Sequence, residues 1–453
     1  MNTLFDELRQ KNKTFSFNGF SAVRDEKGVT VTFDFSLDGV CEFHPTTTVF
    51  TDNLTLLNDF DSPSAKSILF ALGMVELVSY WKAACPPTVL VRCGRLSDED
   101  VLWWKKLWWG GLGEFFYRNQ IETDFDSFVQ IKSEGDFPLW QGCRTGGLSL
   151  VPVGGGKDSD VTLSLLSDRK DRLRCFTVND QLARTQGVLA AGLNESDIVR
   201  TKRIIAPELL ELNRQGYLNG HTPFSAIVGF LGLYCAYLIG ATDLILSNES
   251  SANEASVAGQ AVNHQYSKSY EFEQDLNRYI QAHFGGFARY FSLLRCFNEL
   301  QIAAQFAALK QYHGVFVSCN AGSKQNIWCG RCAKCLFVYI ILSPFLSPEE
   351  LAKIFGSDLL NKEELRADFL GLTGQAASKP FECVGTVREV NAALTETKKQ
   401  YLMRGEPLPL LLRDFAGGEP IKPLLTEFNE ENSVPDEFLH YTKEMYAYAS
   451  SLS

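Results

Sequence analysis

Apolar and polar residues alternate along the first part of the chain, which is the pattern of strands with one buried face. Residues 15–37, FSFNGFSAVRDEKGVTVTFDFSL, alternate on both sides of the polar turn DEKG and therefore predict a β-hairpin. From residue 64 to residue 84 the apolar positions recur at helical spacing instead. Aromatic residues then crowd residues 101–117, VLWWKKLWWGGLGEFFY. Such a run is expected in the core or at a domain interface, and stacking on a ligand ring is the alternative.

A second pattern begins at Leu148, where short apolar runs alternate with stretches of helical periodicity. This succession predicts an α/β domain built on a mostly parallel, doubly wound sheet. The expected strands are residues 148–153, 173–178, 197–200, 243–247 and 315–318. The expected helices are residues 158–166, 181–191, 224–239, 271–283 and 299–311. Ligands of such sheets bind at the carboxyl ends of the strands, so the loops that follow the strands should carry the site.

The two patterns together predict three regions. Residues 1–145 are expected to form an N-terminal α+β domain, a candidate for substrate recognition. Residues 146–345 should form the α/β domain, and residues 346–453 a mostly helical C-terminal region.

The most apolar stretch, residues 224–246, carries a single charge and is long enough to span a bilayer. Gly240 and the pair Thr242–Asp243 interrupt it, and the polar sequence SNESSANE follows at once. A buried helix that ends near Gly240, followed by a buried strand, is therefore favoured over a membrane span.

The composition fits an ordinary globular protein. The 453 residues are 45% hydrophobic and 21% charged, with a formal net charge of −11, which argues against a general nucleic-acid binder. The first residues, MNTLFDELRQKNKTF, lack the apolar core of a signal peptide. Four of the twelve cysteines lie in one short window, which favours a metal site in a reduced cytoplasm over disulfides. We expect no nucleic-acid partner and no membrane partner.

The sequence VPVGGGKDSDVTLSLL, residues 151–166, places three glycines between an expected strand and an expected helix. A Walker A loop requires Ser or Thr where Asp158 stands, and a dinucleotide fingerprint requires Gly where Ser159 stands. Glycines nevertheless let backbone N–H groups converge on an anion, and the start of the helix favours negative charge. The alternative is a tight turn in which Asp158 caps the helix.

The glycine loop resembles the PP-loop of ATP pyrophosphatases, Ser-Gly-Gly-x-Asp-Ser, with Gly154 in place of the first serine. The resemblance implies a HUP-like fold that binds ATP and Mg²⁺ and cuts ATP between its α and β phosphates. The implied nucleotide-binding residues are Gly154, Gly155, Gly156, Lys157, Asp158 and Ser159. Asn179, after the second expected strand, is a candidate for the adenine, and capping of the next helix is an equal alternative.

The sequence CNAGSKQNIWCGRCAKC contains four cysteines, Cys319, Cys329, Cys332 and Cys335, with the spacing C-x9-C-x2-C-x2-C. Four thiolates at this spacing can close a tetrahedral Zn²⁺ site, and an iron–sulfur cluster is the main alternative. We expect a structural zinc site.

Six motifs together resemble the bacterial UDP-N-acetylmuramoyl-L-alanyl-L-glutamate epimerases of the MurL type: GGGKDS, NGHTPFSAIVGFLGLYCAYL, SNESSANE, VNHQYSKSYEFE, WCGRCAKC and KPFECVG. The resemblance covers most of residues 146–390. It implies a cytoplasmic enzyme of peptidoglycan precursor synthesis, which uses ATP and Mg²⁺ to convert the terminal L-Glu of UDP-MurNAc-L-Ala-L-Glu to D-Glu. AMP and pyrophosphate would be released.

Polar residues in the loops of these motifs are the candidates for the inversion. The candidate catalytic residues are Cys383, Glu254, His264 and Lys268, and Lys268 is equally suited to pairing with phosphates. The candidate substrate-binding residues are His221, Thr222, Asn248, Glu249, Asn253 and Tyr266. For each of these polar residues, capping or structural hydrogen bonding is the alternative. Two other functions stay open: a PP-loop ligase or RNA-modifying enzyme, and a zinc-stabilised nucleotide-binding protein without catalysis.

Overall fold

The computed structural model describes residues 3–52, 54–136, 139–253, 266–376, 379–380, 382 and 384–453. Eleven strands form one sheet: β1 (Thr14–Arg24), β2 (Gly28–Leu37), β3 (Cys41–Phe43), β4 (Thr46–Phe50), β5 (Thr88–Val91), β6 (Gln130–Ser133), β7 (Leu148–Pro152), β8 (Leu173–Val178), β9 (Ile198–Ile204), β10 (Ala241–Leu246) and β11 (Arg289–Ser292). The α-helices of the described residues are α1 (Thr3–Lys11), α2 (Pro63–Trp81), α3 (Asp98–Gly111), α4 (Gly113–Arg118), α5 (Lys157–Leu165), α6 (Leu182–Ala190), α7 (Pro207–Arg214), α8 (Phe224–Ile239), α9 (Tyr270–His283), α10 (Glu299–Ala308), α11 (Ala333–Leu342), α12 (Pro348–Phe355), α13 (Arg366–Leu372), α14 (Val387–Arg404), α15 (Leu410–Arg413), α16 (Ile421–Leu425) and α17 (Leu439–Ser451).

The five strands from β7 to β11 run parallel in the order β11-β10-β7-β8-β9. The chain therefore adds β8 and β9 on one side of β7, and then adds β10 and β11 on the other side of β7. The order reverses between β7 and β10, which is the position where open α/β sheets bind ligands. The mostly parallel α/β sheet predicted from the sequence is confirmed.

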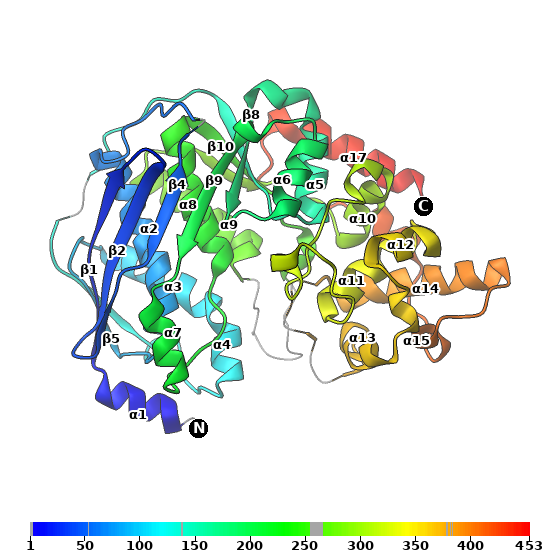
Figure 1. The fold of residues 1–453 in the computed structure, drawn as a ribbon, viewed down its shortest axis with the longest axis horizontal. Helices are drawn as coiled ribbons and strands as arrows, with labels where there is room; N and C mark the ends of the chain where they lie inside the picture. The colour runs from blue at the N-terminus through cyan, green and yellow to red at the C-terminus, as the bar shows by residue number, and fades with distance from the viewer. Residues whose placement is uncertain are drawn as a thin grey trace.

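The N-terminal strands extend the same sheet and do not form a separate one. Strand β4 pairs antiparallel with β9, where Thr46 lies opposite Ile204. Beyond β4 follow β2 and β1, which form the predicted hairpin, and then β5 and β6 parallel to β1. Figure 1 shows these N-terminal strands in blue on one side of the molecule and the C-terminal helices α11–α15 in yellow and orange on the other.

Two hydrophobic cores cover the two faces of the parallel strands. Along β7, Leu150 belongs to one core and its neighbour Val151 to the other. Leu244 and Ile245 divide between the cores in the same way on β10. Because successive side chains of a strand point to opposite faces, a parallel sheet covered on both faces reads as a continuous apolar run.

The most apolar stretch forms the expected helix and strand. Helix α8 ends at Gly240, which adopts a φ of 74° as the left-handed C-cap, and β10 begins at the next residue. No helix among the described residues is long and apolar enough to cross a bilayer.

The aromatic run at 101–117 lies in α3 and α4, where Trp104 and Trp108 are fully buried. Trp104 stacks on Phe230 of α8 with ring centroids 5.4 Å apart. The interpretation as core is therefore confirmed.

One predicted strand is wrong. Residues 315–318 form no strand, and the fifth parallel strand is β11, 23 residues or more upstream. The backbone N–H of Val317 donates to the carbonyl of Gly155, 2.8 Å away, so this segment lies against the glycine loop and not in the sheet. Strand β11 has only four residues, too few to show a clear apolar pattern in the sequence.

Candidate active site

A cavity of about 380 Å³ opens at the reversal of strand order, beside the carboxyl ends of β7 and β10. Its lining comes from the glycine loop, the start of α6, the start of α8, the loop after β10, Lys268, and the segment around the cysteine cluster. The polar and glycine residues of this lining are Gly154, Gly156, Asp158, Ser159, Gln181, Arg184, Ser225, Ser247, Asn248, Lys268, Tyr290, Ser318, Cys319, Asn320, Ser323 and Lys334.

The glycine loop depends on glycine at two positions. Gly155 has a φ of 84°, a conformation that side-chain-bearing residues rarely adopt. Gly156 approaches the neighbouring segment so closely that an added Cβ would lie 3.1 Å from the Cβ of Ser318. The loop therefore presents bare backbone to the cavity, and Gly156 is the N-cap residue of α5. Backbone N–H groups at such a helix start favour an anion.

Lys157 lies beneath the loop and outside the cavity lining. Its side chain is 3% exposed and forms ion pairs with Asp158 and Glu299. Burial raises the pKa of Glu299 to about 8, although the charge of Lys157 opposes this rise. Burial also acts to raise the pKa of Asp158, but the nearby charges of Lys157, Lys334 and Lys268 outweigh it and lower that pKa. Asp158 is therefore held ionised, and it is the one carboxylate in the described lining of the cavity.

Arg295, a fully buried side chain, holds the loop after β10 to the turn that precedes α9. Arg295 donates to the carbonyl of Glu249 at 2.8 Å and to the carbonyl of Lys268 at 2.6 Å. Its own counter-charge is Glu273, 3.2 Å away and equally buried. One arginine thus fixes the two ends of the segment that carries the expected residues Glu254 and His264.

A buried carboxylate joins the C-terminal region to the same loops. Glu389, at the third position of α14, accepts hydrogen bonds from the Ser251 hydroxyl at 2.6 Å and from the Glu299 N–H at 2.8 Å. It also accepts from the N–H and the hydroxyl of Thr386. Burial raises the pKa of Glu389.

Glu382, in the sequence KPFECVG, contacts the cavity wall. Asn320, which lines the cavity, donates a hydrogen bond to Glu382. The residue that precedes the expected residue Cys383 in the chain therefore lies next to the site.

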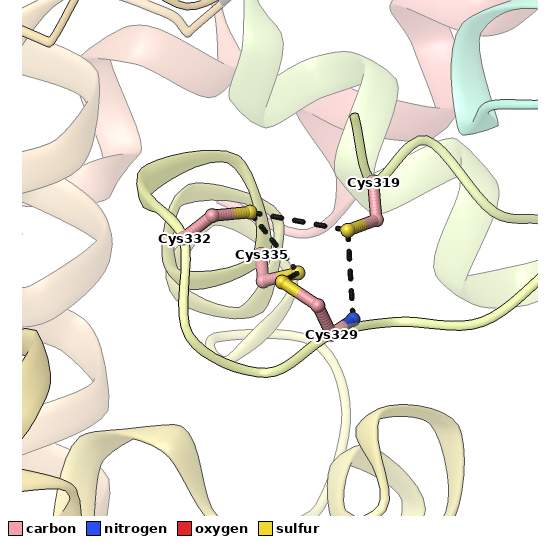
Figure 2. Close-up of side chains that lie close together, drawn as sticks. All are labelled: Cys319, Cys329, Cys332 and Cys335. Atoms are coloured by element: carbon pink, nitrogen blue, oxygen red, sulfur yellow. Dashed lines mark hydrogen bonds between the residues drawn. The ribbon is translucent and has the colours of Figure 1, made fainter. Parts of the chain in front are cut away.

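The four cysteines predicted to bind metal come together, as Figure 2 shows. Their sulfur atoms all lie within 4.8 Å of one another, with Sγ–Sγ distances of 3.9 Å for Cys319–Cys332, 3.7 Å for Cys329–Cys335 and 3.5 Å for Cys332–Cys335. A tetrahedral ion with Zn–S bonds of about 2.3 Å separates its sulfurs by about 3.8 Å. The Gly322 N–H also donates to Cys319 Sγ at 3.1 Å, an outer hydrogen bond typical of ligating sulfur. The cluster can hold one metal ion, and its geometry is compatible with structural zinc.

The structure brings six of the predicted nucleotide, substrate and catalytic residues into the cavity lining. They are Gly154, Gly156, Asp158, Ser159, Asn248 and Lys268. The predicted residues Glu254, His264 and Cys383 lie outside the described residues, as does the side chain of Asn253.

Several other predicted residues have structural partners away from the lining. The Asn179 side chain accepts from the Arg203 N–H at 2.8 Å. His221 lies 3.4 Å from Glu114, and Thr222 accepts from Lys82 at 2.9 Å, both just before α8. Two more predicted residues are outside the cavity lining: the Tyr266 hydroxyl lies 3.5 Å from Asp275, and Glu249 is buried with 6% exposure.

Among the charged residues at the glycine loop and the cavity, sequence reasoning missed three. Glu299 reads as the first residue of a helix whose start is marked by the capping box of Asn298 and Gln301, so no signal distinguished it. Arg184 lines the cavity while its guanidinium donates to the carbonyl of Asn179 at 2.7 Å. Lys334 lies between two cysteines, and its position in the CAKC sequence was the available signal.

Comparison with known proteins gives matches along most of the chain. The family model described as the MurL N-terminal domain matches residues 6–293, and that of the MurL C-terminal domain matches residues 315–413. The chain is 36% identical to the UDP-N-acetyl-alpha-D-muramoyl-L-alanyl-L-glutamate epimerase of Xanthomonas oryzae pv. oryzae over 349 residues, which cover 75% of this chain and 76% of the relative. It is 35% identical to the enzyme of the same name from Salinispora tropica over 379 residues, 81% of this chain and 82% of the relative. The glycine loop lies within the first family match and the cysteine cluster within the second.

Proposed function

The chain belongs to the MurL family, and we propose that it converts the terminal L-Glu of UDP-MurNAc-L-Ala-L-Glu to D-Glu at the expense of ATP. The family resemblance inferred from the sequence motifs is thereby confirmed. The observation that carries the ATP-dependent part of the proposal is the position of the glycine loop. The loop lies where the strand order reverses. Its bare backbone, Asp158 and several cationic side chains line the same cavity.

Activation by ATP makes the inversion chemically accessible. The Cα proton next to a carboxylate is a very weak acid, because its removal adds a second negative charge. In the proposed reaction a carboxylate oxygen attacks the α-phosphorus of ATP, pyrophosphate leaves, and an acyl adenylate remains. A base then removes the Cα proton, a proton returns to the opposite face, and water releases AMP and the D-glutamyl product. The chain of steps matches the PP-loop chemistry expected from the glycine loop.

We assign the residues on one side of the cavity to two roles, phosphate binding and Mg²⁺ binding. The backbone of Gly154 and Gly156, the Ser159 hydroxyl and the start of α5 bind the phosphates of ATP. Asp158, held ionised, is the carboxylate positioned for the Mg²⁺ that accompanies ATP.

The opposite wall is assigned to the glutamate end of the substrate. Asn248 and Lys268 line this wall, and the candidate bases remain Glu254, His264 and Cys383. Arg295 and Glu389 position the segments that carry these three residues, because they bind the described ends of the two loops.

The cysteine cluster is proposed to hold a structural zinc ion. Four thiolates fill the coordination of a tetrahedral ion and leave no position for a reacting atom. Bound zinc would supply folding energy at the cavity wall, and a multi-iron cluster would need its cysteine sulfurs farther apart than 4.8 Å. The expected setting of the reaction is peptidoglycan precursor synthesis in the cytoplasm.

Incubation with UDP-MurNAc-L-Ala-L-Glu, ATP and Mg²⁺ tests the proposal. We expect one pyrophosphate and one AMP for each D-Glu that appears after acid hydrolysis of the product. Asp158→Asn should abolish pyrophosphate release, while Asp171→Asn, an exposed carboxylate outside the cavity lining, serves as the control. Pyrophosphate release without D-Glu would instead indicate a ligase, and ATP binding without pyrophosphate release would indicate a non-catalytic protein.

A further inference from the structure

We infer that the cysteine cluster positions a nucleotide-binding residue. Lys334, held between Cys332 and Cys335, binds the phosphates of a nucleoside triphosphate, so the metal and the nucleotide stabilise each other's binding. The inference rests on the proposed function only in taking ATP as the ligand of the cavity. It gives the cluster a role in ligand binding in addition to its role in folding.

The lysine of the glycine loop does not serve the cavity in this structure. Lys157 is 3% exposed and pairs with two acids, Asp158 and Glu299, beneath the loop. A triphosphate carries several negative charges, so its binding needs cations that reach the cavity itself.

Three cationic side chains contribute to the described lining of the cavity: Arg184, Lys268 and Lys334. The guanidinium of Arg184 donates to the backbone carbonyls of Gly154, Val178 and Asn179, so it holds the glycine loop against the neighbouring strand end. Lys268 belongs to the segment held by Arg295, and its charge, like that of Lys334, acts on Asp158. Lys334 is the cation that comes from the cluster, and its charge acts on Asp158 and Glu299 at the glycine loop.

The cluster controls where Lys334 lies because the ligating residues flank it on both sides. Cys332 is the N-cap residue of α11, and Cys335 is buried in the first turn of that helix. A metal bound by both cysteines therefore fixes the backbone from which the Lys334 side chain extends.

The same metal would fix a second part of the cavity wall. Ser318, Cys319 and Asn320 also line the cavity, and Val317 is hydrogen-bonded to Gly155 of the glycine loop. Metal coordination by Cys319 joins this segment to α11, so both segments of the wall depend on one ion. Because binding couplings are reciprocal, a nucleotide that contacts this wall must in turn strengthen metal retention.

The first test compares ATP binding by variants that remove one positive charge from the cluster segment. Lys334→Gln should raise the Kd for ATP about tenfold, and Lys334→Arg should restore it to within about threefold of the wild type. Arg331→Gln is the matched control, because Arg331 is exposed, lies between Cys329 and Cys332, and is outside the cavity lining. Titration calorimetry gives the Kd, and elemental analysis confirms equal metal content in all variants.

The second test measures how fast the metal passes to a chromophoric chelator, with and without ATP. ATP should slow the transfer at least about threefold in the wild type and should slow it clearly less in Lys334→Gln. Unchanged ATP affinity in Lys334→Gln, or equal transfer rates with and without ATP in the wild type, would overturn the inference. Wild-type protein that binds ATP in this way but forms no D-Glu would contradict the proposed function and leave this inference intact.

Discussion

Two buried ion pairs stabilise this molecule in different ways. Where the N-terminal strands join the parallel strands, Arg203 makes a two-bonded pair with Glu76, at 2.8 Å and 2.6 Å, so one cation meets one carboxylate. Beneath the cavity, one cation, Lys157, is shared by two acids, Asp158 and Glu299, and burial raises the pKa of Glu299 to about 8. A matched buried pair can serve structure alone, whereas a buried acid with a shifted pKa at a cavity indicates a binding or catalytic site. The comparison predicts a structural role for the first pair and a functional role for the second.

The largest expected effect comes from Lys157→Met. The change removes the cation that Asp158 and Glu299 share beneath the glycine loop, so pyrophosphate release should fall at least about 1000-fold, or about 4 kcal/mol of transition-state stabilisation. The free energy of unfolding should fall by about 3 kcal/mol as well. A coupled assay for pyrophosphate and urea unfolding measure the two effects.

The double variant Lys157→Met/Glu299→Gln is the control for this prediction. It should regain at least about half of the lost stability and remain inactive, because one of the two acids left without their cation is removed while Asp158 stays without Lys157. Pyrophosphate release near the wild-type rate in the single variant would show that this pair is structural, like the other one.

Cys332→Ser should have the next largest effect. Loss of one thiolate should reduce the bound metal from one ion per chain to a small fraction and lower the free energy of unfolding by several kcal/mol. Elemental analysis of protein purified under reducing conditions checks the metal. Cys235→Ser, a change at a buried cysteine of α8 outside the cluster, should keep the full metal content, and its loss of metal would contradict the assignment.

Arg203→Met breaks the pair between Arg203 and Glu76 and tests whether that pair has only a structural role. It leaves Glu76 buried without a cation and should lower the free energy of unfolding by about 3 kcal/mol, measured by urea denaturation. The Kd for ATP should stay within about twofold of the wild type, because the pair is not part of the cavity lining. A tenfold weaker ATP affinity in the folded variant would place this pair in the functional region and remove the contrast.

The smallest expected effect is a pH dependence that comes from Lys82, beside the joint between the two sets of strands. Burial, and then the charge of Arg203, lower the pKa of Lys82 to about 8 from an ordinary value of 10.5. Between these two values the unfolded chain binds a proton that the folded chain has released, so this group's contribution to stability rises with pH. From pH 7 to pH 9 the wild type should gain about 1 kcal/mol relative to Lys82→Met. Urea denaturation at both pH values gives the difference, and an equal response of the two proteins would contradict the lowered pKa.

Much of the fold followed from local pattern. The residues of α8 were predicted without error because the helix is bounded by Pro223 and Gly240, and β8 because four of its six residues are apolar. Strand β11 was missed since its four residues carry no pattern, and residues 315–318 were assigned to the sheet although Val317 pairs with Gly155 of the glycine loop and not with a strand.

The site was accessible to sequence reasoning only where its residues are neighbours in the chain. The glycine loop and the four cysteines are compact motifs, and both lie at the cavity or its wall. The partner of Lys157 lies 142 residues away at Glu299, and Arg295 acts through backbone carbonyls that no side-chain pattern marks. Such contacts arise from the tertiary fold and leave no trace in local spacing.

Deuterium exchange at the glutamate Cα tests the central claim most directly, because the claim is that ATP activates this carbon for inversion. The enzyme and UDP-MurNAc-L-Ala-L-Glu are incubated in D₂O, first without nucleotide and then with ATP and Mg²⁺, and the Cα deuterium is measured by NMR. We predict no incorporation in the first sample, and in the second sample deuterium at the Cα of the D-Glu product together with pyrophosphate. Incorporation at the same rate without ATP would contradict the account, since proton removal would then not depend on the adenylate that the glycine loop is proposed to make.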